Sequence, residues 1–353
     1  MTDARTWPTI LTSLLEGDDI SVSQAEWAMA QIMTGSASPA QIGAFLVALR
    51  AKGVTVDEIV GFRDAILAEA LPLALPAASL DIVGTGGDRF GTVNVSSMSA
   101  IVAAAAGVPI VKHGNRAASS KSGSSDVLSA LGIDLSLDES ALVSSFEETG
   151  IAFVHAGRFL PGFRHVAPVR KEIGIPTVFN FLGPLCNPVR PEASAVGVAD
   201  AERAPLIAGV FRIRGASALV FRGDDGLDEL TTTGHSRIWE VNRGSLTEHD
   251  LDPRDLGIAR AEIDDLLGGS PEENADTVRR TLAGDSGPVR DIVLLNAAAG
   301  LVAFDLFANP ESGERPMLER LAEQIARAAD AIDSGAAVAK LEAWAASTTA
   351  HAG

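Results

Sequence analysis

Positive charge is scarce in this sequence and gathers at one place. The chain has five lysines, and two of them, Lys112 and Lys121, lie in a short segment that also contains Arg116. This segment, residues 112–124, reads KHGNRAASSKSGS and follows a strand-like run. Cationic donors, hydroxyl groups and a glycine- and serine-rich backbone suit a polyphosphate ligand. We therefore interpret the segment as an anion site in preference to a polar surface loop.

A glycine-rich turn, residues 84–88 (GTGGD), follows another strand-like run, residues 80–83. Glycine permits a positive φ and lets backbone N–H groups approach an anion closely. The turn does not match the dinucleotide fingerprint, because Arg89 stands where the third glycine belongs, and it lacks the Lys-Ser/Thr pair of a P-loop. Taken alone, it is equally consistent with an ordinary structural turn.

The next segment, residues 92–97 (TVNVSS), opens a helix. Hydroxyl and amide side chains at this position can cap the helix. They can also present N–H and hydroxyl groups to a phosphate, or a hydroxyl to Mg²⁺. The spacing does not distinguish these two interpretations.

Acidic residues follow a third strand-like run, residues 216–222. The segment 224–229 reads DDGLDE and includes Asp228 and Glu229. In α/β sheets ligands bind beyond the carboxyl ends of the strands, and hard oxygen ligands suit Mg²⁺ shared with substrate phosphates. An exposed acidic turn is the alternative. A polyphosphate site needs counter-cations, however, and this segment is the best candidate to hold them.

The helical and strand-like runs around these segments predict that the chain has a helical N-terminal part and an α/β part. Residues up to about 70 show only helical signals, including capping boxes that start at Ser38 and Thr55 and a further possible cap at Ser23. A proline-containing stretch, residues 71–76, then indicates a hinge. Beyond it, strand-like and helical runs alternate, with a possible edge strand at 237–241 and alanine-rich helices at 292–306 and 318–346. This alternation predicts an α/β domain around a mainly parallel sheet.

Composition excludes several classes of protein. The 46 acidic and 28 basic residues give a formal net charge of −18, which argues against a general nucleic-acid binder. The single cysteine, Cys186, excludes internal disulfides and cysteine-based zinc sites and fits a reducing cytoplasm. The apolar region 100–111 is too short to span a membrane, and the N-terminus does not resemble a signal peptide. We therefore expect a cytoplasmic protein with no nucleic-acid or membrane partner.

Taken together, these segments resemble the anthranilate phosphoribosyltransferase family. The likeness covers most of the chain, in the family's order and spacing. Besides the segments above, it includes VRKEIG at 169–174, NFLGPLCNP at 180–188 and DGLDE at 225–229.

The resemblance implies an α/β fold with two domains and a homodimeric assembly. A small all-helical domain, residues 1–75, would be joined by helices from about 166–190, and residues 76–353 would form a large α/β domain with a mainly parallel central sheet. The implied reaction is the Mg²⁺-dependent transfer of the phosphoribosyl group of phosphoribosyl pyrophosphate (PRPP) to the amino nitrogen of anthranilate. Pyrophosphate is released, and the family uses two Mg²⁺ ions per active site.

Site residues also follow from the resemblance. The metal ligands would be Ser96, Asp228 and Glu229, and anthranilate would be bound by Gly84, Asn115 and Arg170, the last of these at its carboxylate. Lys112, His113 and Arg170 would act through charge and positioning, and no general base is expected because an aromatic amine is neutral at pH 7. The residues expected to bind PRPP are Gly84, Gly87, Asp88, Thr92, Asn94, Val95, Ser96, Ser97, Lys112, His113, Gly114, Asn115, Arg116, Ala117, Ala118, Ser119, Ser120 and Ser124.

The sequence departs from the family pattern at three positions. Leu160 replaces a histidine of the acceptor tunnel, Gly157 replaces a proline, and Arg89 replaces the glycine after Asp88. These changes leave open a related phosphoribosyltransferase with a different aromatic amine acceptor. A nucleoside phosphorylase of the same architecture is a further alternative, and the paired Asp228 and Glu229 argue against it. A non-catalytic ligand-binding paralogue is another, and the complete set of Ser96, Asp228 and Glu229 disfavours it.

Overall fold

The computed structural model describes residues 5–115 and 122–352, and the chain divides into two compact units. One unit comprises Met1–Pro72 and Ala156–Pro188, and the other comprises Leu73–His155 and Val189–Gly353. The second segment of the first unit therefore begins at residue 156, earlier than the start at about 166 that the resemblance implies.

The first unit is helical. Its first four helices each begin at a capping side chain, and the capping boxes expected at Ser38 and Thr55 are confirmed. The expected cap at Ser23 is wrong, because the hydroxyl of Ser21 instead accepts the hydrogen bond of the Gln24 N–H at 3.3 Å. The helices are α1 (Trp7–Leu15), α2 (Val22–Met33), α3 (Pro39–Lys52), α4 (Val56–Ala68), α8 (Ala156–Phe159) and α9 (Phe163–Ile173), followed by the 3₁₀ turns Val178–Asn180 and Gly183–Leu185.

Aromatic side chains pack against one another in this helical unit. Trp7 packs against Trp27 and Phe45, and Phe45 packs edge-on against Phe62 at 5.7 Å between ring centroids. Leu160, the residue that departs from the family pattern, is only 2% exposed. An apolar side chain at this position is thus stabilised by burial.

The second unit is built on a seven-stranded sheet with the strand order β3-β2-β1-β4-β5-β6-β7. The first five strands in this order are parallel, and β6 and β7 extend the sheet in antiparallel fashion. The expected strand at 237–241 exists as β6, but it is not the edge strand, because β7 pairs along its length. The strands are β1 (Leu80–Gly84), β2 (Ile110–Gly114), β3 (Ile151–His155), β4 (Ala193–Gly197), β5 (Ser217–Gly223), β6 (Ser236–Asn242) and β7 (Ser245–Leu251).

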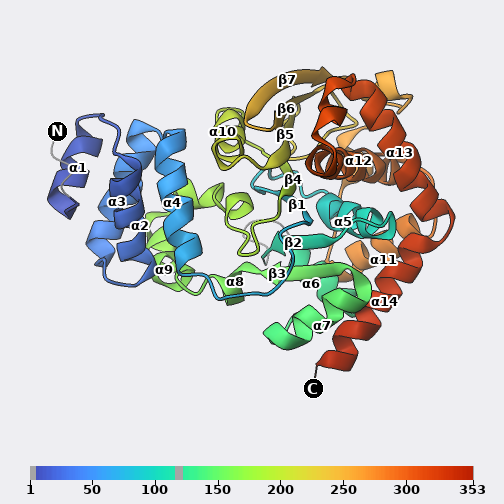
Figure 1. Ribbon diagram of the computed structural model, residues 1–353, viewed down its shortest axis with the longest axis horizontal. Coiled ribbons are helices and arrows are strands. Elements are labelled where there is room, and N and C mark those ends of the chain that lie inside the picture. Colours follow the sequence, from blue (N-terminus) through green and yellow to red (C-terminus); the bar gives the residue numbers. More distant parts are fainter. Residues whose placement is uncertain (1–4, 116–121, 353) are drawn as a thin grey trace. The chain divides into compact units, whose positions relative to one another are not determined.

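Helices cover both faces of this sheet, with α12 and α5 on one side and α10 on the other (Figure 1). Gly300 lets α12 approach β1, since a Cβ atom there would lie 2.6 Å from the Ile82 side chain. The helix expected at 318–346 is in fact two helices, separated by Gly335 at φ 78°. The helices are α5 (Val95–Ala105), α6 (Ser124–Ala130), α7 (Glu139–Thr149), α10 (Ala204–Arg214), α11 (Pro271–Leu282), α12 (Pro288–Ala308), α13 (Met317–Asp333) and α14 (Ala336–His351).

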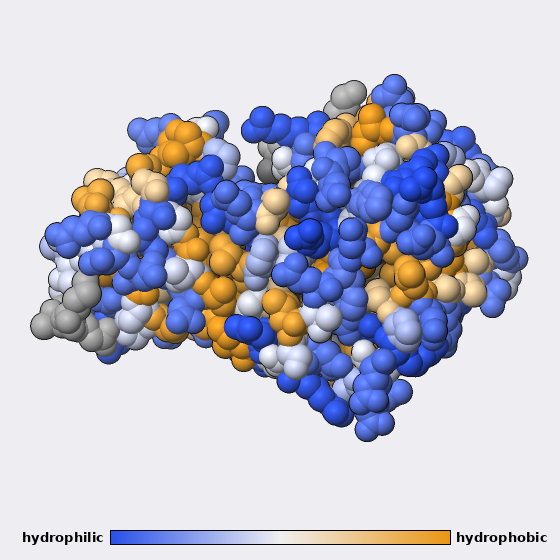
Figure 2. All heavy atoms as spheres, turned by 90° about the horizontal axis from the view of Figure 1, so that it is seen from above, coloured by the Kyte–Doolittle hydropathy of each residue, from blue (hydrophilic) through white to orange (hydrophobic). Residues whose placement is uncertain are grey.

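Among the described residues, α12 is the one helix long and apolar enough to cross a membrane. Most of it is buried inside the α/β unit, where it packs against β1, β4 and β5. This placement is typical of a core helix of a globular domain. On the face drawn in Figure 2, hydrophilic residues predominate and apolar residues form separate patches.

A buried ion pair links the antiparallel end of the sheet to α13. Arg320 donates two hydrogen bonds to the Glu240 carboxylate, at 3.0 and 2.7 Å, and the His249 ring lies 2.8 Å from the same carboxylate. Arg320 and Glu240 are 2% and 4% exposed. Removing one member of such a pair leaves the other charge buried and incompletely compensated.

We expect the substitution Arg320→Met to lower the free energy of unfolding by about 3 kcal/mol, because it strands the buried Glu240 carboxylate. The matched control is Arg315→Met, since Arg315 pairs with Glu323 at the surface and should contribute less than about 1 kcal/mol. Chemical denaturation of both variants measures the difference. Equal effects of the two substitutions would contradict this account of the Glu240 pair.

Candidate active site

The carboxyl ends of β1 and β4 meet at the point where the strand order reverses. Strands β2 and β3 lie on one side of β1, and β4 and β5 lie on the other. The last residues of the two central strands, Gly84 and Gly197, are direct partners in the parallel ladder. Open α/β sheets bind ligands beyond such a reversal.

Asp228 lies directly against this pair of glycines. A Cβ atom on Gly197 would come within 1.6 Å of the Asp228 carbonyl oxygen, and one on Gly84 within 2.3 Å of its Oδ2. The same Oδ2 accepts a hydrogen bond from the Gly86 N–H at 2.7 Å. The absence of side chains at 84 and 197 therefore allows the carboxylate segment to reach the glycine-rich turn.

Three carboxylates crowd this place. Burial, and then the neighbouring charge of Asp88, raise the pKa of Asp228 to about 7. Burial and the charge of Asp228 likewise raise the pKa of Glu229 well above its usual value. Burial is also the main cause of a raised pKa at Asp88. The protein thus concentrates negative charge that needs a cation.

Lys112 provides the positive charge among the described residues here. Its side chain is buried, and its Nζ donates hydrogen bonds to the Ile82 carbonyl oxygen at 2.5 Å and to Ser96 Oγ at 3.2 Å. Burial lowers the pKa of Lys112, while the charges of Asp81, Glu229 and Asp228 oppose that shift. The structure therefore brings the predicted lysine, serine and carboxylates together.

The segment predicted as an anion site, residues 112–124, does not begin after the strand. Residues 112–114 belong to strand β2, where they pair with 153–155 of β3. His113 is 2% exposed, and its backbone N–H donates to Asp81 at 3.0 Å. Asn115, which is exposed, follows the strand, and its carbonyl oxygen accepts the Ser124 hydroxyl at 3.2 Å. The other predicted members of this segment, namely Arg116, Ala117, Ala118, Ser119 and Ser120, lie outside the described residues.

The N-terminus of α5 contributes the next group of predicted residues. Asn94 is the N-cap residue, and Val95, Ser96 and Ser97 form the first turn. The Asn94 side chain makes no capping hydrogen bond; instead its Nδ2 donates to the Ser122 carbonyl oxygen at 3.4 Å. The Val95 and Ser97 N–H groups donate to the carbonyl oxygens of Val93 and Asn94, at 2.8 and 3.1 Å. The positive end of the helix dipole still favours a negatively charged ligand here.

The turn between β1 and α5 has left-handed backbone at several positions. Gly86, Gly87 and Gly91 have positive φ, and so does Arg89, at 66°. A φ in this range is costly for a side chain such as that of arginine. The glycine that the resemblance implies at position 89 would adopt this φ without that cost. Thr92 closes the turn by a bridge to Leu267.

The loop that carries Asp228 and Glu229, residues 224–235, is held by hydrogen bonds. The Asp225 carboxylate accepts from the hydroxyls of Thr231 at 2.6 Å and Thr233 at 2.5 Å, and from the Leu227 N–H at 3.0 Å. Directly after Glu229, both backbone groups of Leu230 bond to the buried amide of Asn296 at 2.9 Å. The carboxylates are therefore presented from a fixed loop.

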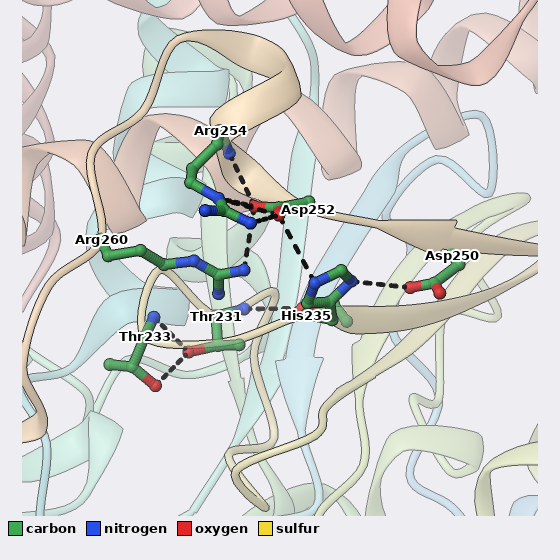
Figure 3. A network of polar contacts seen from close by, with 8 residues as sticks. Thr231, Thr233, His235, Asp250, Asp252, Arg254 and Arg260 are labelled. Atoms are coloured by element: carbon green, nitrogen blue, oxygen red, sulfur yellow. Dashed lines mark hydrogen bonds and ion pairs between the residues drawn. The ribbon is translucent and has the colours of Figure 1, made fainter.

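The end of this loop is fixed by a second network (Figure 3). His235 lies between Asp250 and Asp252, with each nitrogen–oxygen distance 3.4 Å. Asp252 also binds Arg254 at 2.6 Å and Arg260 at 2.9 Å. Hydrogen bonds from Arg254 lower the pKa of Asp252. This network attaches the loop to β7 and the segment that follows it.

The oxygen ligands beyond the carboxyl ends of β1 and β4 fit a Mg²⁺ ion that is also coordinated by a substrate. Among residues 5–115 and 122–352, no group of three or more His, Cys, Asp or Glu side chains is arranged to hold a metal ion by itself. Two adjacent carboxylates and one serine hydroxyl leave coordination positions for phosphate oxygens and water, as Mg²⁺ prefers. The raised pKa values of the crowded carboxylates indicate that a bound cation would be favourable here.

Arg170 belongs to the helical unit and is described within it. It lies on α9, with its guanidinium 5.6 Å from the centre of the Phe179 ring and its Nη2 3.4 Å from Asn180 Oδ1. Burial lowers the pKa of Arg170. The aromatic ring and the amide thus hold a cationic side chain in one orientation.

Gly197, Asn296 and the threonine partners of Asp225 could not be identified from the sequence. No local signal identifies them, since each acts through a residue far along the chain or through packing. The sequence did contain a detectable sign for α11, the capping box at Ser270 and Glu273.

Comparisons with known proteins match nearly the full length of the chain to one family. Residues 8–70 match the model of the helical bundle domain of a glycosyl transferase family, and residues 77–338 match that of its a/b domain. The anthranilate phosphoribosyltransferase of Clavibacter michiganensis is 64% identical over 351 residues, covering 99% of this chain and 100% of the relative.

Solved structures give the same result. The crystal structure of anthranilate phosphoribosyltransferase from Thermus thermophilus has a TM-score of 0.87 and 40% identity, covering 96% of this chain and 99% of that one. The Saccharomyces cerevisiae enzyme in complex with PRPP and Mg has a TM-score of 0.86 and 30% identity, covering 98% of both chains.

Proposed function

The chain belongs to the anthranilate phosphoribosyltransferase family, and from this premise we propose how its residues carry out the reaction. The enzyme transfers the phosphoribosyl group of PRPP to the amino nitrogen of anthranilate and releases pyrophosphate, a step of tryptophan biosynthesis. The alternatives of a different aromatic amine, a phosphorylase or a non-catalytic paralogue find no support among the relatives.

The observation that carries the site assignment is the contact of Asp228 with Gly84 and Gly197 beside the buried Lys112. At this place Asp228, Glu229 and Ser96 would hold Mg²⁺, with two ions in each site. When bound, Mg²⁺ supplies positive charge that stabilises the departing pyrophosphate. These three side chains then fix the position of that charge.

PRPP would bind across the glycine-rich turn, the start of α5 and the end of β2. Gly87 and Asp88 come from the turn, and the positive N-terminal end of α5 would face the phosphates. Lys112 acts as a fixed positive charge, because the Ile82 carbonyl oxygen and Ser96 hold its ammonium group in place. The remaining contacts are assigned to Thr92, Asn94, Val95, Ser97, His113, Gly114, Asn115, Arg116, Ala117, Ala118, Ser119, Ser120 and Ser124.

Anthranilate would bind through Gly84, Asn115 and Arg170, with the Arg170 guanidinium paired to its carboxylate. Its amine is neutral at pH 7 and attacks the anomeric carbon without prior deprotonation. Positioning of the two substrates therefore dominates the chemistry. We assign no general base, and His113, buried in β2, acts by orientation.

We further propose a cytoplasmic homodimer.

The fluorescence of anthranilate tests this proposal. With purified enzyme, PRPP and Mg²⁺, the fluorescence should decay while pyrophosphate appears in equal amount, and omission of Mg²⁺ should stop both signals. Pyrophosphate release with another aromatic amine but not with anthranilate would contradict the assigned acceptor. No release with any acceptor would indicate a binding protein.

A further inference from the structure

A segment far along the chain pairs with the turn that precedes α5. The Val93 N–H donates to the Leu266 carbonyl oxygen at 2.9 Å, and the Gly268 N–H donates to that of Gly91 at 2.8 Å. A Cβ atom on Gly268 would lie 2.9 Å from the Thr92 carbonyl oxygen. Residues 266–268 thus run closely beside residues 91–93, which lie next to Asn94.

Asn274 extends this contact to the Asn94 side chain. It lies in the first turns of α11 and is 3% exposed. Its Oδ1 accepts a hydrogen bond from the Gly269 N–H at 2.7 Å, and its Nδ2 donates to Asn94 Oδ1 at 2.9 Å. A backbone N–H can only donate. The Gly269 N–H therefore fixes which end of the Asn274 amide faces Asn94.

The orientation of Asn94 follows from that of Asn274. Because Asn274 presents its NH₂ group, Asn94 must turn its oxygen towards Asn274 and its own NH₂ group away from it. Within residues 5–115 and 122–352, that NH₂ group makes a long hydrogen bond of 3.4 Å, to the Ser122 carbonyl oxygen. Asn94 thus presents a donor at the start of α5, where a donor suits a phosphate and an oxygen would repel it.

We propose that Asn274 is a positioning residue that fixes the Asn94 amide with its donor group facing PRPP. This inference rests on the proposed function, in which Asn94 binds PRPP. Asn274 itself touches no substrate in this scheme. The Gly269 N–H fixes the orientation of the Asn274 amide, and Asn274 in turn fixes that of Asn94.

The substitution Asn274→Asp tests the proposal at nearly constant size. Its carboxylate can still accept from the Gly269 N–H but cannot donate to Asn94. The Asn94 amide should then flip and donate to the new carboxylate, turning its oxygen towards PRPP. We expect the dissociation constant of PRPP with Mg²⁺, measured by isothermal titration calorimetry, to rise about 10-fold or more. The KM for anthranilate should stay within about twofold.

The added negative charge alone could weaken PRPP binding, and a double-mutant cycle with Asn94→Ala separates the two causes. In the Asn94→Ala background, Asn274→Asp should have almost no further effect, because no amide is left to flip. The same loss in both backgrounds would overturn the proposal. If Asn94→Ala left PRPP affinity unchanged, both the assignment of Asn94 to the PRPP site and this inference would fail.

Two further variants complete the experiment. Asn274→Ala removes the donor without adding charge and should weaken PRPP binding about threefold to tenfold; unchanged binding would overturn the proposal even if Asn274→Asp failed to fold. The matched control is Asn242→Asp on β6, where the amide donates to the Pro310 carbonyl oxygen at 2.8 Å. Its PRPP affinity should equal that of the wild type, and an equal loss there would contradict a specific role for Asn274.

Discussion

The double substitution Asp228→Asn, Glu229→Gln should reduce kcat/KM by at least about 10³-fold, which corresponds to about 4 kcal/mol of transition-state stabilisation. The substitutions keep the size of both side chains but remove the two charges that would hold Mg²⁺ at the pyrophosphate. Steady-state kinetics with saturating Mg²⁺ measures the loss.

The same double substitution should lower activity but should not lower the thermal stability of the metal-free protein. The pKa of Asp228 is raised to about 7, so the folded protein favours the protonated carboxyl and loses stability as the pH rises through that value. Without metal at pH 8, the neutral variant should therefore unfold at the same temperature as the wild type or at a higher one.

The matched control for this variant is Glu319→Gln, Asp330→Asn, which removes two exposed carboxylates from α13. It should retain wild-type kinetics. Near-normal turnover of the Asp228, Glu229 double variant would contradict the metal assignment, whatever its stability.

The substitution Gly197→Ala should lower kcat by at least about 100-fold, although residue 197 offers no functional group. The added Cβ atom would lie 1.6 Å from the Asp228 carbonyl oxygen, so the backbone of the carboxylate segment must move. A displacement of about 1 Å at a catalytic group is enough for a loss of this size. Overpacking should also lower the free energy of unfolding by about 3 kcal/mol.

Gly43→Ala in α3 is the control for this prediction. Its Cβ atom would make only an ordinary contact, at 3.8 Å from Val169, and alanine favours the helix. Activity should be unchanged and stability equal or slightly higher. If Gly197→Ala also retained full activity, the position of Asp228 would not depend on the close approach described above.

Local signals in the sequence predicted much of the fold. The capping boxes at Ser38 and Thr55 act within one turn of helix, so they could be identified without tertiary information. The alternation of strand-like and helical runs predicted the mainly parallel sheet. Strand β7 was missed because it carries exposed, polar side chains along most of its length, with no buried face to produce an alternating pattern.

The charged residues of the site could be predicted from the sequence. The residues that hold them in position could not. Lys112 and Asp228 attracted notice because lysine is rare in the chain and paired carboxylates follow a strand, and the structure places them together. Gly197 and Asn274 act through contacts with residues 31 and 180 positions away, Asp228 and Asn94. Their types are common in strand ends and helices, so only the folded chain reveals their role.

A crystal structure of the enzyme with PRPP and Mn²⁺ in place of Mg²⁺ tests the central claim most directly, because the anomalous signal locates the metal. We expect the peak at about 2.2 Å from carboxylate oxygens of Asp228 or Glu229 and from pyrophosphate oxygens, with the Lys112 ammonium close to the same group. A metal bound to PRPP away from both carboxylates would contradict the account.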